Sequence, residues 1–226
     1  DFARAGTMFD AARQFAPPRG YLVVGQVPTG VEQMIAVAKQ GKSLTPPEVL
    51  AGDEKVQLII QLADIYQQID ENARALILCE LVLDKKTPTT NEQKSWVLFR
   101  RARNPVHRGR DSSRASADYL AGHKLAPKSS WAAQCLFCAG NVMFADSSQR
   151  PIAITLWSRV GKDYPDSPEA ERAAYHIAVA YEYDGRLREA REAFQNYIKN
   201  YPTSPFVRLA EQEHLPKIAA LEQKQT

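Results

Sequence analysis

Apolar residues recur at helical spacing along most of the chain, most clearly between Ser167 and Pro202. There they fall at i, i+3, i+4 and i+7 in two successive stripes, and each stripe predicts one buried face of a helix. Asp184-Gly185 separates the stripes, because glycine accepts the backbone conformation that ends a helix. The stripes are Ala173, Ala174, Ile177, Ala178 and Tyr181, then Leu187, Ala190, Ala193, Phe194, Tyr197 and Ile198. This segment therefore predicts a helical hairpin, with Ser167 as N-cap and Pro168 at the first helical position.

Short proline-containing segments between the predicted helices repeat along the chain at nearly constant spacing. The pentad Tyr-Pro-Asp-Ser-Pro begins at Tyr164, and Tyr-Pro-Thr-Ser-Pro begins 37 residues later at Tyr201. A weaker copy begins at Pro127, 38 residues before Pro165, and Pro88 lies 39 residues before Pro127. A fixed period in this range is typical of stacked structural repeats, because one hairpin cannot bury its apolar surface alone.

The best hairpin resembles the tetratricopeptide repeat family, and the residues that carry the resemblance are Ala178, Tyr181, Ala190, Phe194 and Pro202. The Tyr-Pro-x-Ser-Pro punctuation is similar to that of the branch found in bacterial cell-envelope proteins. The resemblance implies an all-α fold, an α-solenoid of stacked antiparallel helical hairpins. It also implies a non-catalytic scaffold that binds a protein or peptide partner on its concave face.

The repeat predicts a solenoid over residues 53–226, built of units 53–88, 91–127, 128–165 and 166–202. A capping helix over 203–223 follows, and we expect it to bend near Pro216. Residues 1–52 do not share the repeat and predict a less regular N-terminal arm. Capping-box patterns in the arm favour short helices at 31–40 and 46–51, and residues 20–27 favour an extended segment.

The family resemblance places a partner-binding groove along one stripe of the first helix of each unit. Tyr175 and Tyr183 are the expected anchors, because large aromatic side chains away from the signature positions suit a binding surface. The alternative is that both pack between hairpins. The full set is Arg172, Tyr175, Val179, Glu182 and Tyr183 in the best unit, Gln134, Phe137 and Asn141 in the unit before it, and Gln57, Ile60 and Asp64 in the first.

Groups able to carry catalysis or bind a metal are sparse. Cys135 and Cys138 form a CxxC pair, but no second ligand pair accompanies it, and the pair falls inside a predicted helix. We therefore interpret both cysteines as small buried residues. No phosphate-binding glycine loop, nucleophile elbow or HExxH motif occurs. The sequence predicts no enzyme activity and no cofactor or metal.

The net charge of +3 is close to balanced, but basic residues cluster in one region. Guanidinium groups at this density suit phosphates or an acidic partner, so an anionic polymer is an alternative ligand. The other interpretation is a solvated turn between two helices. The cluster consists of Arg100, Arg101, Arg103, Arg108, Arg110 and Arg114.

The expected function is a non-catalytic scaffold for a protein or peptide, in a periplasmic or cell-envelope complex, with the cytoplasm as the alternative compartment. Nucleic acid is not the favoured partner. A third hypothesis is a structural subunit that docks through residues 1–52. The sequence contains no run of 18 apolar residues and therefore predicts no transmembrane helix. The chain opens at Asp1 without a leader, which indicates a removed leader or a fragment.

Overall fold

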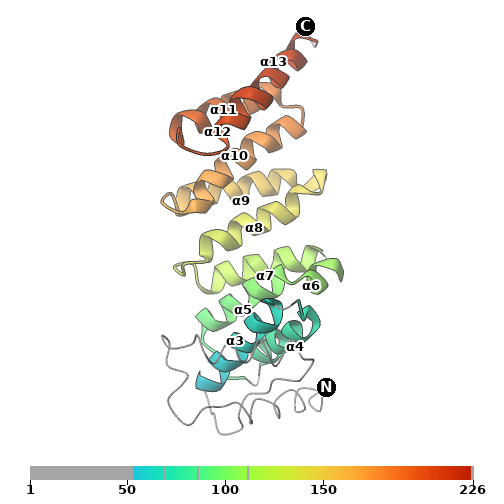
Figure 1. The fold of residues 1–226 in the computed structure, drawn as a ribbon, viewed down its shortest axis with the longest axis vertical. Coiled ribbons are helices and arrows are strands. Elements are labelled where there is room, and N and C mark those ends of the chain that lie inside the picture. Colours follow the sequence, from blue (N-terminus) through green and yellow to red (C-terminus); the bar gives the residue numbers. More distant parts are fainter. Residues whose placement is uncertain (1–52, 69, 86, 111, 225–226) are drawn as a thin grey trace. The chain divides into compact units, whose positions relative to one another are not determined.

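The computed structural model describes residues 53–68, 70–85, 87–110 and 112–224, and every regular element in these ranges is helical (Figure 1). The described residues divide into two compact units, the first ending at residue 126 and the second beginning at residue 127. Within each unit, helices that follow one another pack as antiparallel pairs. The predicted all-α class, a solenoid of stacked helical hairpins, is therefore confirmed for the described residues.

The first unit contains one regular helical pair and one interrupted pair. Its helices are α3 (Asp53–Gln68), α4 (Asn72–Leu83), α5 (Asn91–Arg103), α6 (Pro105–Arg110) and α7 (Ser112–Leu125). Helix α3 packs against α4, and α5 packs against α7. The core between α3 and α4 includes Leu62, Tyr66 and Leu78, each at most 1% exposed. Thr90 begins α5 with a capping box that includes Gln93, so local sequence sets this helix start.

A short helix occupies the arginine-rich region for which a solvated turn was one interpretation. Helix α5 ends at Arg103, and α6 begins at Pro105, one residue later. Asn104 is 1% exposed and fixes this junction, since its Nδ2 donates to the carbonyl oxygen of Asn72 at 2.8 Å. Residues 105–110 therefore form a helix and not a turn, although Arg103 and Arg108 are exposed to solvent, as that interpretation expected.

The second unit contains two hairpins and a terminal segment. Its elements are α8 (Ala132–Phe144), the 3-10 helix η2 (Ser147–Gln149), α9 (Arg150–Asp163), α10 (Pro168–Tyr183), α11 (Leu187–Asn200), α12 (Val207–Leu209), the π-helix η3 (Ala210–His214) and α13 (Leu215–Gln223). Helix α9 packs against both α8 and α10, so the hairpins stack side by side (Figure 1). Phe194 and Ala190 of α11 are completely buried against α10, where the sequence predicted its stripe.

The predicted ends of the α10–α11 hairpin agree with the structure except in one hydrogen bond. Gly185 has a φ of +69°, in the left-handed region that glycine tolerates. Pro168 lies in the first turn of α10, as expected. Ser167 is at the N-cap position, but its hydroxyl donates to the carbonyl oxygen of Tyr164 at 2.8 Å and caps no backbone N–H. The serine stabilises the preceding turn instead.

The terminal segment changes helix type immediately before Pro216, where the sequence predicted a bend. Residues Ala210–His214 form a π-helix, and α13 begins at Leu215. A proline lacks the N–H for the usual i to i−4 bond and crowds the carbonyl four residues earlier. A π turn widens the helix at this point and relieves the crowding.

The predicted arm of residues 1–52, with its short helices and its extended segment, lies outside the described residues. The boundary between the arm and the solenoid at residue 53 therefore remains a prediction. The division of the solenoid into the four units is likewise a prediction.

Candidate partner-binding surfaces

The predicted groove stripe does not form one open surface. Tyr175, Phe137 and Glu182 are 8%, 6% and 9% exposed, which makes them interior residues. The stripe residues that remain exposed are Gln57, Asn141, Arg172 and Tyr183; Asp64, Gln134 and Val179 are half-buried, and Ile60 is buried. The prediction of a groove lined by all of these side chains is therefore wrong for the buried members.

Tyr175 is a core residue because the C-terminal segment covers it. Its ring stacks on Phe206 with 4.9 Å between centroids, and its hydroxyl is hydrogen-bonded to Nε2 of His214 at 2.8 Å. Burial raises the pKa of Tyr175 to about 12. The packing alternative considered for this tyrosine is correct, and it cannot anchor a partner while this segment stays in place.

Glu182 joins α10 to the same C-terminal segment. Its carboxylate contacts Nδ1 of His214 at 2.5 Å and accepts a hydrogen bond from Nζ of Lys217 at 2.5 Å. Burial alone would raise the pKa of Glu182, but the hydrogen bonds from Lys217 and His214 outweigh it and lower the pKa below its ordinary value. A buried carboxylate with two basic partners is a structural anchor.

Phe137 lies inside the α8–α9–α10 stack. Its ring meets His176 of α10 edge-on at 5.2 Å, and its carbonyl oxygen accepts a hydrogen bond from Nε1 of Trp157 at 3.1 Å. The next hairpin therefore covers Phe137, whereas Asn141 of the same helix stays exposed. The sequence could not show this, because His176 lies 39 residues further along the chain.

Tyr183 is the exposed aromatic residue of the stripe, with 65% of its surface accessible. Phe144 meets its ring edge-on at 5.4 Å, and the Arg150 guanidinium lies 5.4 Å from the Phe144 ring and 5.6 Å from the Tyr183 ring. Nη1 of Arg150 also donates to Asp184 at 2.7 Å. We call Phe144, Arg150, Tyr183 and Asp184 the Tyr183 cluster. Sequence analysis missed Phe144 and Arg150 in this role, because they reach Tyr183 from another hairpin.

Two arginines of the predicted basic patch, Arg100 and Arg101, are paired within the first unit. Arg100 lies 2.5 Å from Asp64, and Arg101 donates two hydrogen bonds of 2.7 Å to Asp118. Asp118 also lies 3.0 Å from Nε2 of His107. Arg103, Arg108 and Arg114 are exposed, whereas the side chain of Arg110 is outside the described residues.

Cys79 and Cys135 lie in environments that suppress their reactivity. Burial raises the pKa of Cys79 and that of Cys135 to about 12, and both side chains are at most 4% exposed. The interpretation of the CxxC pair as two buried small residues is correct for Cys135 but not for Cys138, which is half-buried. Over the described ranges, no three or more His, Cys, Asp or Glu side chains come together as a possible metal site.

Comparison with known proteins supports the tetratricopeptide assignment. The tetratricopeptide repeat family model matches residues 172–204. A crystal structure of nearly identical tetratricopeptide-like repeats from a putative kinesin light chain of Podosopora anserina is similar in fold. It has a TM-score of 0.56 at 18% identity, over 90% of this chain and 98% of that chain.

A single-substitution variant of the same Podosopora anserina repeats has a TM-score of 0.56 at 17% identity, over 88% of this chain and 95% of that one. At such identities the likeness concerns the fold alone, and the fold is tetratricopeptide-like. A comparison with curated protein sequences finds no match. No helix in the part of the chain that the structure describes has the length and apolar character needed to span a bilayer.

Proposed function

We propose that this chain is a non-catalytic scaffold that binds a protein or peptide partner through the Tyr183 cluster. The tetratricopeptide-like fold supports the general role, since repeats of this kind present extended binding surfaces. The high pKa of Cys79 and of Cys135 disfavours either as a nucleophile, because the thiolate is the reactive form.

The single observation that carries the proposal is the exposed but supported ring of Tyr183. A long side chain ordinarily loses rotamer freedom on binding, which weakens the complex. Here the Phe144 ring and the Arg150 guanidinium hold the Tyr183 ring before any partner arrives. Tyrosine and arginine are also the residue types that most often carry binding energy in interfaces. The cluster therefore has the composition of an interface centre, and its exposed ring is already in contact with two neighbouring side chains.

The partner can be identified and the site tested in two steps. Benzoylphenylalanine in place of Tyr183, in the cells that naturally produce the protein, would crosslink the partner on irradiation. Calorimetry with the purified partner would then compare the wild type with Tyr183→Ala. We expect the dissociation constant to rise at least about tenfold, since loss of an interface centre costs about 1.4 kcal/mol or more.

Arg188→Ala is the matched control, because Arg188 lies on the adjacent helix with 82% of its side chain exposed and forms a surface ion pair with Glu192 of the same helix. It should leave the dissociation constant unchanged. Equal affinities for the wild type and Tyr183→Ala would refute the proposed site, and an equal loss in both variants would indicate a nonspecific effect.

The two alternative functions have less support. An anionic polymer would need a row of available cations, whereas Arg100 and Arg101 are paired with Asp64 and Asp118. Binding through residues 1–52 remains a proposal for a deletion experiment that follows oligomeric state. We also propose the cell envelope as the compartment, on the Tyr-Pro-x-Ser-Pro pentads alone, with the cytoplasm as the alternative; fractionation of the producing cells tests it.

A further inference from the structure

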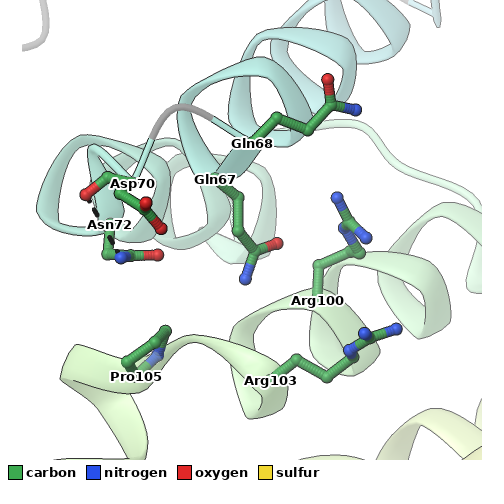
Figure 2. A pocket seen from close by; sticks show the side chains of 7 residues that line it. All are labelled: Gln67, Gln68, Asp70, Asn72, Arg100, Arg103 and Pro105. Atoms are coloured by element: carbon green, nitrogen blue, oxygen red, sulfur yellow. Dashed lines mark hydrogen bonds between the residues drawn. The ribbon is translucent and has the colours of Figure 1, made fainter.

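An open cavity of about 280 Å³, with both polar and apolar walls, lies in the first unit between the α3–α4 turn and the α5–α6 junction (Figure 2). Gln67 and Gln68 line it from the end of α3, Asp70 and Asn72 from the turn and the start of α4, and Arg100 and Arg103 from the end of α5. In Figure 2 the Gln67 amide extends from α3 toward the helix that carries both arginines. The cavity lies at the lower limit of small-molecule sites, so its size suits one side chain of a larger partner.

The two arginines in the cavity differ in what they already contact. Nε of Arg100 lies 2.5 Å from Oδ1 of Asp64, and its guanidinium lies 5.4 Å from the Trp96 ring. Arg103 is exposed and lies 5.4 Å from the Phe99 ring, but it forms no ion pair with any residue that the structure describes. Arg103 therefore supplies the cation available to a ligand, while Arg100 is already neutralised.

Amide groups that line the same cavity are also available. The side chains of Gln67 and Gln68 make no hydrogen bond within the described part of the chain, although both line the cavity. Asn72, the first residue of α4, also lines the cavity. Among the described residues, no side chain caps the N-terminus of this helix. Free amide donors near a guanidinium favour an oxygen anion.

Asp70 limits which anion fits. Its carboxylate lines the same cavity, so it disfavours a continuous run of phosphates or a doubly charged phosphate group. The same carboxylate can accept a hydrogen bond from a backbone N–H, which a peptide carries beside every side chain. A peptide with one carboxylate therefore suits both groups of this cavity, because the carboxylate can pair with Arg103 and a backbone N–H can donate to Asp70.

We propose that this cavity receives an aspartate or glutamate side chain of the protein partner, with Arg103 as its ion-pair partner and Gln67 and Gln68 as hydrogen-bond donors. This inference rests on the proposed scaffold function but not on the Tyr183 cluster, which lies in the other unit.

The test uses the isotopically labelled full chain and acetyl-glutamate methylamide as the probe. Titration should shift the Arg103 Nε–Hε and the Gln67 side-chain NMR signals in a saturable manner, whereas acetyl-glutamine methylamide should not. Arg103→Gln should weaken binding by up to about fivefold, as expected for loss of one exposed charge pair. Arg108→Gln is the matched control, because Arg108 is exposed nearby but does not line the cavity.

The outcomes separate the competing explanations. Arg103 also lies in the last turn of α5, where a cation stabilises the helix end. Equal probe affinity for the wild type and Arg103→Gln, with only a lower melting temperature, would reduce Arg103 to that role and overturn the inference. Equal shifts with inorganic phosphate, or equal losses in Arg108→Gln, would also overturn it. A failed Tyr183 experiment leaves these signals unaffected, so the two proposals fail separately.

Discussion

Gly140 of α8 leaves no room for a side chain, and Gly140→Ala is the sharpest test of the packing in the second unit. A β-carbon at this position would lie 2.4 Å from Nε1 and 2.8 Å from Cδ1 of Trp157. Such contacts are impossible without movement. The Trp157 ring is completely buried, and Phe144 and His176 flank it at 5.7 and 5.2 Å between centroids. The ring can therefore move only if the surrounding helices move.

The expected loss of stability follows from three contributions. Inserting a methyl group into a closed core costs about 1–3 kcal/mol. Displacement of the indole would break its 3.1 Å hydrogen bond to the carbonyl oxygen of Phe137, and an unpaired buried donor costs about 1–3 kcal/mol. Alanine offsets about 1 kcal/mol of this loss, because its helix propensity is higher than that of glycine. The net destabilisation should be about 1–5 kcal/mol.

Gly161→Ala is the matched control, because Gly161 lies on the partner helix α9 and nothing lies within 4 Å of an added β-carbon. This variant should gain about 0.5–1 kcal/mol of stability from helix propensity. Urea denaturation followed by circular dichroism would measure both changes, and the Trp157 indole NMR signal would report on the ring. If Gly140→Ala were as stable as the wild type and left that signal unmoved, the packing argument would be refuted.

Two further predictions concern titratable groups. The pKa of Glu182 is lowered in the folded chain, so its stabilising contribution is complete above the pKa of an unfolded glutamate and is lost as pH falls through the folded value. The stability difference between the wild type and Glu182→Gln in urea should therefore be larger at neutral pH than at a pH below the folded value, and a constant difference would contradict the assigned ion pairs. Cys79 and Cys135, each with a pKa of about 12, should resist iodoacetamide at mildly alkaline pH in the folded chain, whereas half-buried Cys138 should react first. Mass spectrometry of timed samples measures this order, and equal rates for all three would show that the first two are not enclosed.

Local signals made the repeat architecture predictable from the sequence. Helix faces follow from residue spacing within one turn, and the stop at Gly185 follows from the φ of +69° that glycine accepts. Pro216 likewise predicted a disturbed helix, although the sequence did not specify that a π turn would relieve it. In each case the physical cause lies within a few residues of its effect.

The candidate sites were less predictable, because each depends on residues distant in the sequence. Tyr175 and Tyr183 share a helix and a family-derived stripe, yet one is 8% exposed and the other 65%. The difference arises because Phe206 and His214 cover Tyr175 from a later segment. The arginine cluster behaves in the same way, since charge density along the chain did not reveal that Arg101 is paired with Asp118.

The sequence by itself determined the all-α class, the hairpin of residues 167–202 and the turns that end its helices, since hydrophobic period and glycine or proline geometry act locally. Only the tertiary structure decided which stripe residues are covered, which arginines keep an available charge and which ring Gly140 must accommodate. These properties depend on side chains brought together from other helices, and helical spacing alone carries no information about them.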